Sequence, residues 1–265
     1  MPDIKLGEEY FNNLYYSTAF KDGGEGKIFK SNQHTIYKFF DRTGIGISTI
    51  LLEEYELLMQ RKLAKIEYIY NLSDKLRDKY GEFNVLPLST ISCNGQLVGY
   101  EMTYDEDDVD LYKTNLKNSQ KIKSLKRISD ILIYYESLGI IYGDIADFNI
   151  LINARNLKPK FCDMDNIKID GYDIDKKDSC LLHFLKSGGQ LDERAHAFML
   201  NVLTLQVLEP HLETRSRVLN YLKSDLIFQT IHKPYFFESP IKDIIKSMHN
   251  VEGFNGEHII QYIKK

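Results

Sequence analysis

The sequence predicts an α+β fold of two lobes, a small β-rich lobe over residues 1–103 and a larger, mainly helical lobe over residues 104–265. Up to Met102, short runs of aromatic and β-branched residues alternate with turn clusters such as DGG and SCNG. After the acidic stretch DEDDVD (105–110), apolar residues recur mainly at helical spacing. The pattern changes only once, so we expect a single boundary, near Tyr104.

The first lobe is expected to contain several short strands and one helical region. The predicted strands are YYSTAF, KIFK, TIYKFF, NVLPL and QLVGYEM. A helix begins at Ser48 or Thr49, either of which can cap it, and continues to about residue 66. A second, more polar helix is expected over residues 67–80.

The second lobe opens with a helix of regular apolar spacing that Gly139 is expected to terminate. Two β-like runs follow at residues 149–153 and 159–164, joined by the turn ARNLK. Residues 192–209 are so apolar that they predict a buried helix, and the last fifty or so residues suggest two or three more helices.

Composition narrows the classes of partner and compartment. The formal net charge is −4, so the chain has no excess of basic surface for nucleic acid or anionic lipid. Three cysteines are spread widely without a CxxC pair, which favours a reducing compartment over a disulfide framework or a structural zinc site. No apolar run approaches membrane-spanning length. We therefore expect a cytoplasmic protein with no membrane span and no nucleic-acid partner.

The turn DGGEGKIF lies between two predicted strands and contains Gly23, Gly24 and Gly26. Glycines without Cβ atoms allow backbone N–H groups to approach a phosphate. A Gly-rich hairpin turn with no ligand explains the same residues, so the turn alone decides nothing.

Lys38 lies inside the strand-like run TIYKFF, among aromatic neighbours. A buried lysine there needs an anion, whereas on an edge strand its ammonium could extend to water. Glu54 of the following helix adjoins the apolar stripe and is our choice of partner, with Glu53 and Glu56 as competing choices.

Asp144 and Asn149 lie five positions apart in YGDIADFNILI, just before a predicted strand. A carboxylate on a rigid loop can act as a general base, and an amide oxygen nearby can ligate Mg²⁺. Asp163 and Asp165 of FCDMDN follow the next strand and would point the same way if that strand continues. Two such acids suit a hard cation, although most isolated DxDN strings are turns.

Taken in order, these motifs resemble the protein-kinase-like superfamily over about residues 15–208. GGEGKIF resembles the Gly-rich loop, IYKFF the strand of the nucleotide lysine, EYELL the regulatory helix, YGDIADFNIL the catalytic loop and FCDMD the metal-binding motif. The GGEG turn, the GD-x4-N loop and the DxDN ending are most similar to a divergent bacterial branch. The resemblance implies a bilobal protein-kinase-like fold that uses ATP and Mg²⁺.

The resemblance also implies roles for single residues. Lys38 would hold the α- and β-phosphates, Glu54 would orient Lys38, and Asp144 would accept the proton of the acceptor hydroxyl. Asn149 and Asp163 would ligate Mg²⁺, and whether Asp163 or Asp165 is the main ligand stays open.

The nucleotide would contact a further set of residues. The glycines Gly23, Gly24 and Gly26 would approach its phosphates, and Ile28 would cover the base. Backbone groups from Thr103 to Asp105 would receive the adenine, with Met102 near the gatekeeper position.

Several positions depart from the usual kinase pattern. Lys21 replaces the first glycine of the loop, and Tyr142 and Gly143 replace the usual His and Arg. Ala146 stands where a lysine usually lies near the γ-phosphate, and His196 stands where the buried helix usually has an aspartate. We interpret His196 as a structural residue.

The leading hypothesis is a kinase that phosphorylates a hydroxyl on a protein or a small molecule, with protein Ser/Thr preferred. One alternative is a nucleotide-binding pseudokinase that works as an interaction module, suggested by Ala146 and Gly143. Another is a small-molecule kinase of the aminoglycoside or choline type, for which the acidic stretch at 105–110 is a weak indication.

Overall fold

The computed structural model describes residues 1–23, 26–40, 49–80, 85–111, 116–146, 148–175, 179–186 and 189–208. Within them the chain is a mixed α+β protein with a six-stranded mixed sheet, two smaller sheets and several helices. None of these described helices is both long enough and apolar enough to cross a bilayer.

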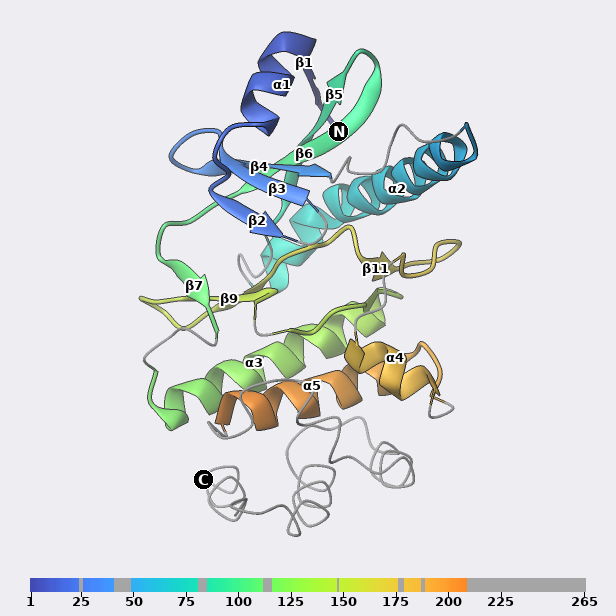
Figure 1. Cartoon of the computed structure of the whole chain (residues 1–265). Coiled ribbons are helices and arrows are strands. Elements are labelled where there is room, and N and C mark those ends of the chain that lie inside the picture. The colour runs from blue at the N-terminus through green and yellow to red at the C-terminus, as the bar shows by residue number, and fades with distance from the viewer. Residues whose placement is uncertain are drawn as a thin grey trace. The chain divides into compact units, whose positions relative to one another are not determined.

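The chain divides into two compact units (Figure 1). The first is Met1–Asp108 with Cys162–Asp165, and the second is Val109–Phe161 with Asn166–Lys265. Most of the first unit is one continuous stretch, which ends five residues beyond the boundary that we expected. It also takes in the short segment that carries Asp163 and Asp165.

The first unit is built on a six-stranded sheet in the order β1-β5-β6-β4-β3-β2. Its strands are β1 (Asp3–Leu6), β2 (Lys21–Gly23), β3 (Gly26–Lys30), β4 (Thr35–Phe40), β5 (Pro87–Cys93) and β6 (Gln96–Thr103). All neighbours are antiparallel except β1 and β5, which are parallel. The predicted strands KIFK, TIYKFF and QLVGYEM are therefore confirmed, and they place Lys38 on the central strand β4.

The predicted strand YYSTAF is wrong, because Tyr15 is the last residue of helix α1 (Glu8–Tyr15) and residues 16–20 form no strand. Phe11 and Tyr15 lie one helical turn apart and are both buried. The Phe11 ring meets Phe39 edge to face, with 5.1 Å between ring centroids. A helix places both residues on one face, as this packing requires, and α1 thereby packs against Phe39 of β4.

Helix α2 (Thr49–Tyr80) is a single helix of 32 residues where we expected two. No Gly or Pro interrupts the sequence between its ends, so no residue breaks the backbone hydrogen bonds. Its buried positions include Met59, Lys62, Lys65, Ile66 and Ile69, which follow the spacing of one helix face, and α2 packs against β5. Lys62 and Lys65 are the two charged members of this buried set.

The second unit is mainly helical, with short strands. Its helices are α3 (Asn118–Ser137), α4 (Ser179–Lys186) and α5 (Glu193–Leu208). Helix α5 is buried over most of its length. It packs against α3 and α4, beside which it lies in Figure 1. The predicted buried helix is thus confirmed, and α3 ends before Gly139, which has a φ of 73°.

Short strands complete the second unit. They are β7 (Asp108–Asp110), which begins in the first unit, β8 (Ile141–Tyr142), β9 (Ile150–Asn153), β10 (Pro159–Phe161) and β11 (Ile167–Lys168). The predicted pair of runs forms the antiparallel hairpin β9–β10, in which Ile150 opposes Phe161. The helices expected in the last fifty residues lie outside the described residues.

Candidate functional site

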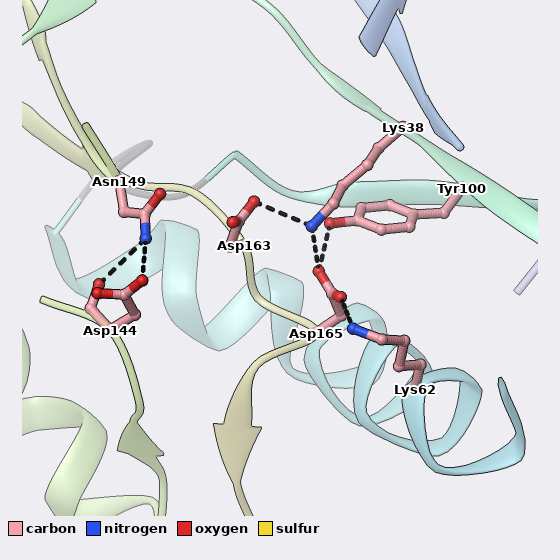
Figure 2. A network of polar contacts seen from close by, with 7 residues as sticks. All are labelled: Lys38, Lys62, Tyr100, Asp144, Asn149, Asp163 and Asp165. Atoms are coloured by element: carbon pink, nitrogen blue, oxygen red, sulfur yellow. Dashed lines mark hydrogen bonds and ion pairs between the residues drawn. The ribbon is translucent and has the colours of Figure 1, made fainter. Parts of the chain in front are cut away.

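Lys38 is enclosed in the middle of the large sheet. It lies opposite Ile28 of β3 and Tyr100 of β6, and the residue is only 3% exposed. Its Nζ is 3.0 Å from Oδ1 of Asp163 and 2.7 Å from Oδ1 of Asp165 (Figure 2). Burial by itself lowers the pKa of Lys38, but the two carboxylates outweigh it and raise that pKa well above its usual value. The ammonium is therefore charged and bound to anions.

Asp165 is the most enclosed acid of this group, with a side chain that is 0% exposed. Its Oδ1 accepts hydrogen bonds from Lys38 and, over 3.0 Å, from Oη of Tyr100, whereas its Oδ2 lies 2.5 Å from Nζ of Lys62. Burial alone would raise the pKa of Asp165, yet the two ammonium groups lower it below the usual range. Asp165 is thus an ionised carboxylate held by three donors.

Tyr100 completes the group from β6. Burial and the Asp165 carboxylate together raise the pKa of Tyr100 well above its usual value, so its hydroxyl stays protonated and donates a hydrogen bond to Asp165. The Lys38 ammonium also lies 5.8 Å from the centroid of the Tyr100 ring. Tyr100 therefore contacts both members of the central ion pair.

Asp163 differs from Asp165 in both backbone and exposure. Its φ of 57° lies in the left-handed region, which Asp tolerates better than most residues. Its side chain is 28% exposed, and one oxygen, Oδ1, makes the contact with Lys38. Left-handed non-glycine residues that persist in a packed fold concentrate at functional sites. Asp163 is therefore an accessible carboxylate in an unusual backbone conformation.

Glu54 does not occupy the role that we expected from the sequence. Glu53, Glu54 and Glu56 are all exposed on α2, while the Lys38 ammonium is bound to Asp163 and Asp165. The physical reason is that the helix face toward the sheet carries Lys62, so α2 supplies a cation and the chain segment after β10 supplies the acids.

The Gly-rich turn joins β2 to β3. Gly23 opposes Gly26 at the end of this hairpin, and Gly24 lies outside the described residues. Gly26 has a φ of 153°, and a Cβ there would be 2.0 Å from the carbonyl oxygen of Phe39. A glycine is therefore required at Gly26 by the packing of β3 on β4, whether or not a phosphate binds. Ile28 lies two residues further along β3, opposite Lys38.

The segment expected to receive adenine begins at the end of β6. Met102 is buried, and the Thr103 N–H and the Tyr104 N–H already donate to the carbonyls of Leu86 and His34, over 3.1 and 2.8 Å. The side chain of Asp105 accepts from the Asp107 N–H over 3.0 Å. Any contact with a base along Thr103 to Asp105 must therefore use other backbone groups of this segment.

In the second unit, Asp144 and Asn149 are directly bonded. Nδ2 of Asn149 donates to Oδ2 of Asp144 over 2.8 Å and to the Asp144 carbonyl over 3.4 Å (Figure 2). Within the loop, the Ala146 N–H donates to the Asp144 carbonyl, and the Asn149 N–H donates to the Ala146 carbonyl. These bonds fix the five-residue spacing as a closed turn. They also assign the amide orientation, with Oδ1 of Asn149 directed away from this carboxylate.

His196 of α5 anchors the beginning of this loop. The Tyr142 N–H donates to Nε2 of His196 over 2.6 Å, and Nδ1 of His196 lies 2.8 Å from Oε1 of Glu136. An Nε2 that accepts leaves the proton on Nδ1, so the ring is neutral and donates to Glu136. A Cβ on Gly143 would lie 2.7 Å from the Asn166 carbonyl oxygen, which explains the glycine there.

Sequence reasoning missed Lys62 and Tyr100. Lys62 could have been found, because it falls on the apolar stripe of α2 between Met59 and Ile66, where a lysine needs a buried anion. Tyr100 carries no such signal, since an aromatic residue on a central strand is ordinary.

Lys38, Asp163 and Asp165 belong to the first unit, whereas Asp144, Asn149 and His196 belong to the second. Among the described residues, no group of three or more His, Cys, Asp or Glu side chains is placed to hold a metal. No model of a known protein family matches the sequence, and no curated protein matches it either. A functional assignment therefore depends on the chemistry of these side chains.

Proposed function

We propose that this chain is an ATP- and Mg²⁺-dependent kinase with the bilobal protein-kinase-like fold, which transfers the γ-phosphate to a hydroxyl group, first of all a protein Ser or Thr. The observation that carries the proposal is the buried Lys38, paired with both acids of the DxD motif. A buried ammonium is costly unless anions meet it, and nucleotide phosphates are anions of the required kind.

The oxygen ligands of the two motifs fit a hard divalent cation. Asp163 offers an accessible carboxylate, and Asn149 offers its Oδ1. Cys162 alone separates Asp163 from Phe161, which opposes Ile150, the neighbour of Asn149. Asn149 and Asp163 therefore flank the same hairpin, β9–β10, in the sequence, and we propose that they serve one cation. When bound, Mg²⁺ supplies neutralisation of charge on the phosphate oxygens.

Asp144 is the proposed general base. The amide of Asn149 holds its Oδ2, so the carboxylate has a defined orientation. In the reaction, Asp144 takes the proton of the acceptor hydroxyl while the acceptor oxygen forms a bond to the γ-phosphorus. The bond from that phosphorus to the bridging oxygen breaks, ADP leaves, and Lys38 holds the α- and β-phosphates.

The proposal is tested by measuring transfer of the labelled γ-phosphate of ATP to protein acceptors and to small hydroxyl compounds. Each measurement is made with magnesium and with a chelator. We expect magnesium-dependent transfer, which Asp144→Asn lowers by at least about 100-fold. Asp130→Asn on the exposed side of α3 is the matched control and should leave transfer unchanged. Equal transfer by wild type and Asp144→Asn would remove Asp144 from the chemistry.

A second candidate is a nucleotide-binding pseudokinase, favoured by Ala146. This side chain is completely buried and carries no charge to offset that of the γ-phosphate. Binding of ATP without transfer to any acceptor class is the result that supports this candidate. Transfer to small hydroxyl compounds but not to proteins would instead identify a small-molecule kinase.

A further inference from the structure

Lys62 and Asp165 form an ion pair between α2 and the segment that follows β10. The two side chains are 7% and 0% exposed, and their charged atoms lie 2.5 Å apart. The Lys62 ammonium also lies 5.4 Å from the centroid of the Phe40 ring, at the end of β4. Lys62 is thus in contact with the element that carries Lys38 as well as with the acid that binds Lys38.

The two acids around Lys38 are not equivalent. Asp165 meets three donors and is fully enclosed, so its oxygens are already committed to Lys38, Tyr100 and Lys62. Asp163 is partly exposed and meets Lys38 through one oxygen. Asp163 is therefore the acid that can exchange its contact with Lys38 for a bound cation. Asp165 keeps its contact with Lys38.

The charges of Lys38, Lys62, Asp163 and Asp165 sum to zero, and Lys65 of α2 is a further, fully buried lysine. Lys38 and Lys62 contribute two positive charges, and Asp163 and Asp165 contribute two negative charges. Loss of the Lys62 ammonium alone leaves a net negative charge beside Lys38, which repels phosphate. Loss of both Lys62 and the Asp165 charge restores neutrality but removes the fixed anchor of Lys38.

We propose that Lys62 and Asp165 act together as positioning residues for Lys38, so that helix α2 orients the nucleotide lysine through a lysine and a bridging aspartate rather than through a glutamate. The inference rests on the proposed function, because orientation of Lys38 matters only if Lys38 binds phosphate. It assigns the metal-binding role to Asp163 and a purely orienting role to Asp165.

The test compares ATP affinity with unfolding free energy in four proteins: wild type, Lys62→Met, Lys62→Arg and the double variant Lys62→Met/Asp165→Asn. We expect ATP binding, measured by calorimetry well below the unfolding temperature, to weaken by at least about tenfold in Lys62→Met. Lys62→Arg keeps the charge and should retain most of the affinity. Lys75→Met, on an exposed position of α2, is the matched control and should bind as wild type does.

The double variant separates positioning from stability. Because it removes the Lys62 ammonium and the Asp165 carboxylate together, we expect it to recover part of the stability that Lys62→Met loses, while its ATP affinity stays weak. If the double variant recovers ATP affinity together with stability, Lys62 and Asp165 are not positioning residues. If wild type binds ATP and Lys62→Met binds it equally well, the inference is wrong and the proposed function stands. If wild type binds no ATP, both are wrong.

Discussion

The backbone N–H of Tyr142 donates a hydrogen bond to Nε2 of His196, a residue 54 positions away in helix α5. This bond holds the start of the loop that contains Asp144 and Asn149. His196→Ala leaves the buried N–H and the Glu136 contact without a partner, and it leaves a cavity in the packing of α5. We expect a loss of about 2 to 4 kcal/mol in the free energy of unfolding.

Urea denaturation measures this loss. His34→Ala, at an exposed position outside α5, should change the unfolding free energy by less than about 0.5 kcal/mol. A loss in His196→Ala no larger than in this control would show that the bond to Tyr142 contributes nothing to the fold.

Asp165 should make stability depend on acid pH. Its pKa is lower in the folded protein than in the unfolded chain, so its contribution is present above the unfolded pKa of about 3.9 and is lost as the pH falls toward the folded value. At neutral pH, Asp165→Asn should cost about 3 to 5 kcal/mol, because it removes the carboxylate that pairs with two buried ammonium groups.

The difference in unfolding free energy between wild type and Asp165→Asn should therefore narrow as the pH falls below about 4. Denaturation series from neutral to acid pH measure it. A difference that stays constant over this range would mean that the pKa of Asp165 is the same in the folded protein and in the unfolded chain, which contradicts its ion pairs with Lys38 and Lys62.

Gly26 should not tolerate a side chain. Gly26→Ala puts a Cβ 2.0 Å from the Phe39 carbonyl oxygen, at a φ that other residues rarely adopt. We expect the melting temperature to fall by an amount equivalent to at least about 2 kcal/mol. Gly7→Ala, where no atom lies within 4 Å of the new Cβ, should cost less than about 1 kcal/mol. Similar melting temperatures for the two variants would contradict the close approach of β3 and β4.

Asp163 should control the response to magnesium. In wild type, ATP with magnesium should raise the melting temperature more than ATP with a chelator. Asp163→Asn weakens the cation ligand, so the two conditions should give the same shift in this variant. Asp130→Asn should behave as wild type does. A magnesium effect that survives in Asp163→Asn would move the metal-binding role to another residue.

Several strands and helices could be predicted from the sequence because their patterns are local. TIYKFF and QLVGYEM have the aromatic and β-branched composition of strands. The long apolar run that forms α5 predicts a buried helix. Helix α1 was missed because eight residues give little periodicity, and the aromatic residues near Tyr15 also suit a strand. The parallel pairing of β1 with β5 joins residues far apart in sequence, so no local pattern predicts it.

The candidate site was predictable in its members but not in its pairing. The sequence indicates that Lys38 needs an anion and that Asp163 and Asp165 lie together, but only the fold brings the lysine to these acids. Glu54 was preferred because it adjoins the apolar stripe of α2, yet the charged residues buried on that helix include Lys62 and Lys65. A rotation of less than one helical turn decides which side chain meets the sheet, and sequence spacing does not resolve it.

The most direct test of the central claim is a crystal structure of the protein with a non-hydrolysable ATP analogue and magnesium. The proposal predicts Nζ of Lys38 within hydrogen-bonding distance of an α- or β-phosphate oxygen, Asp163 on the metal, and Asp165 still in contact with Lys38. A nucleotide bound elsewhere, or phosphates beyond the reach of the Lys38 side chain, would contradict it.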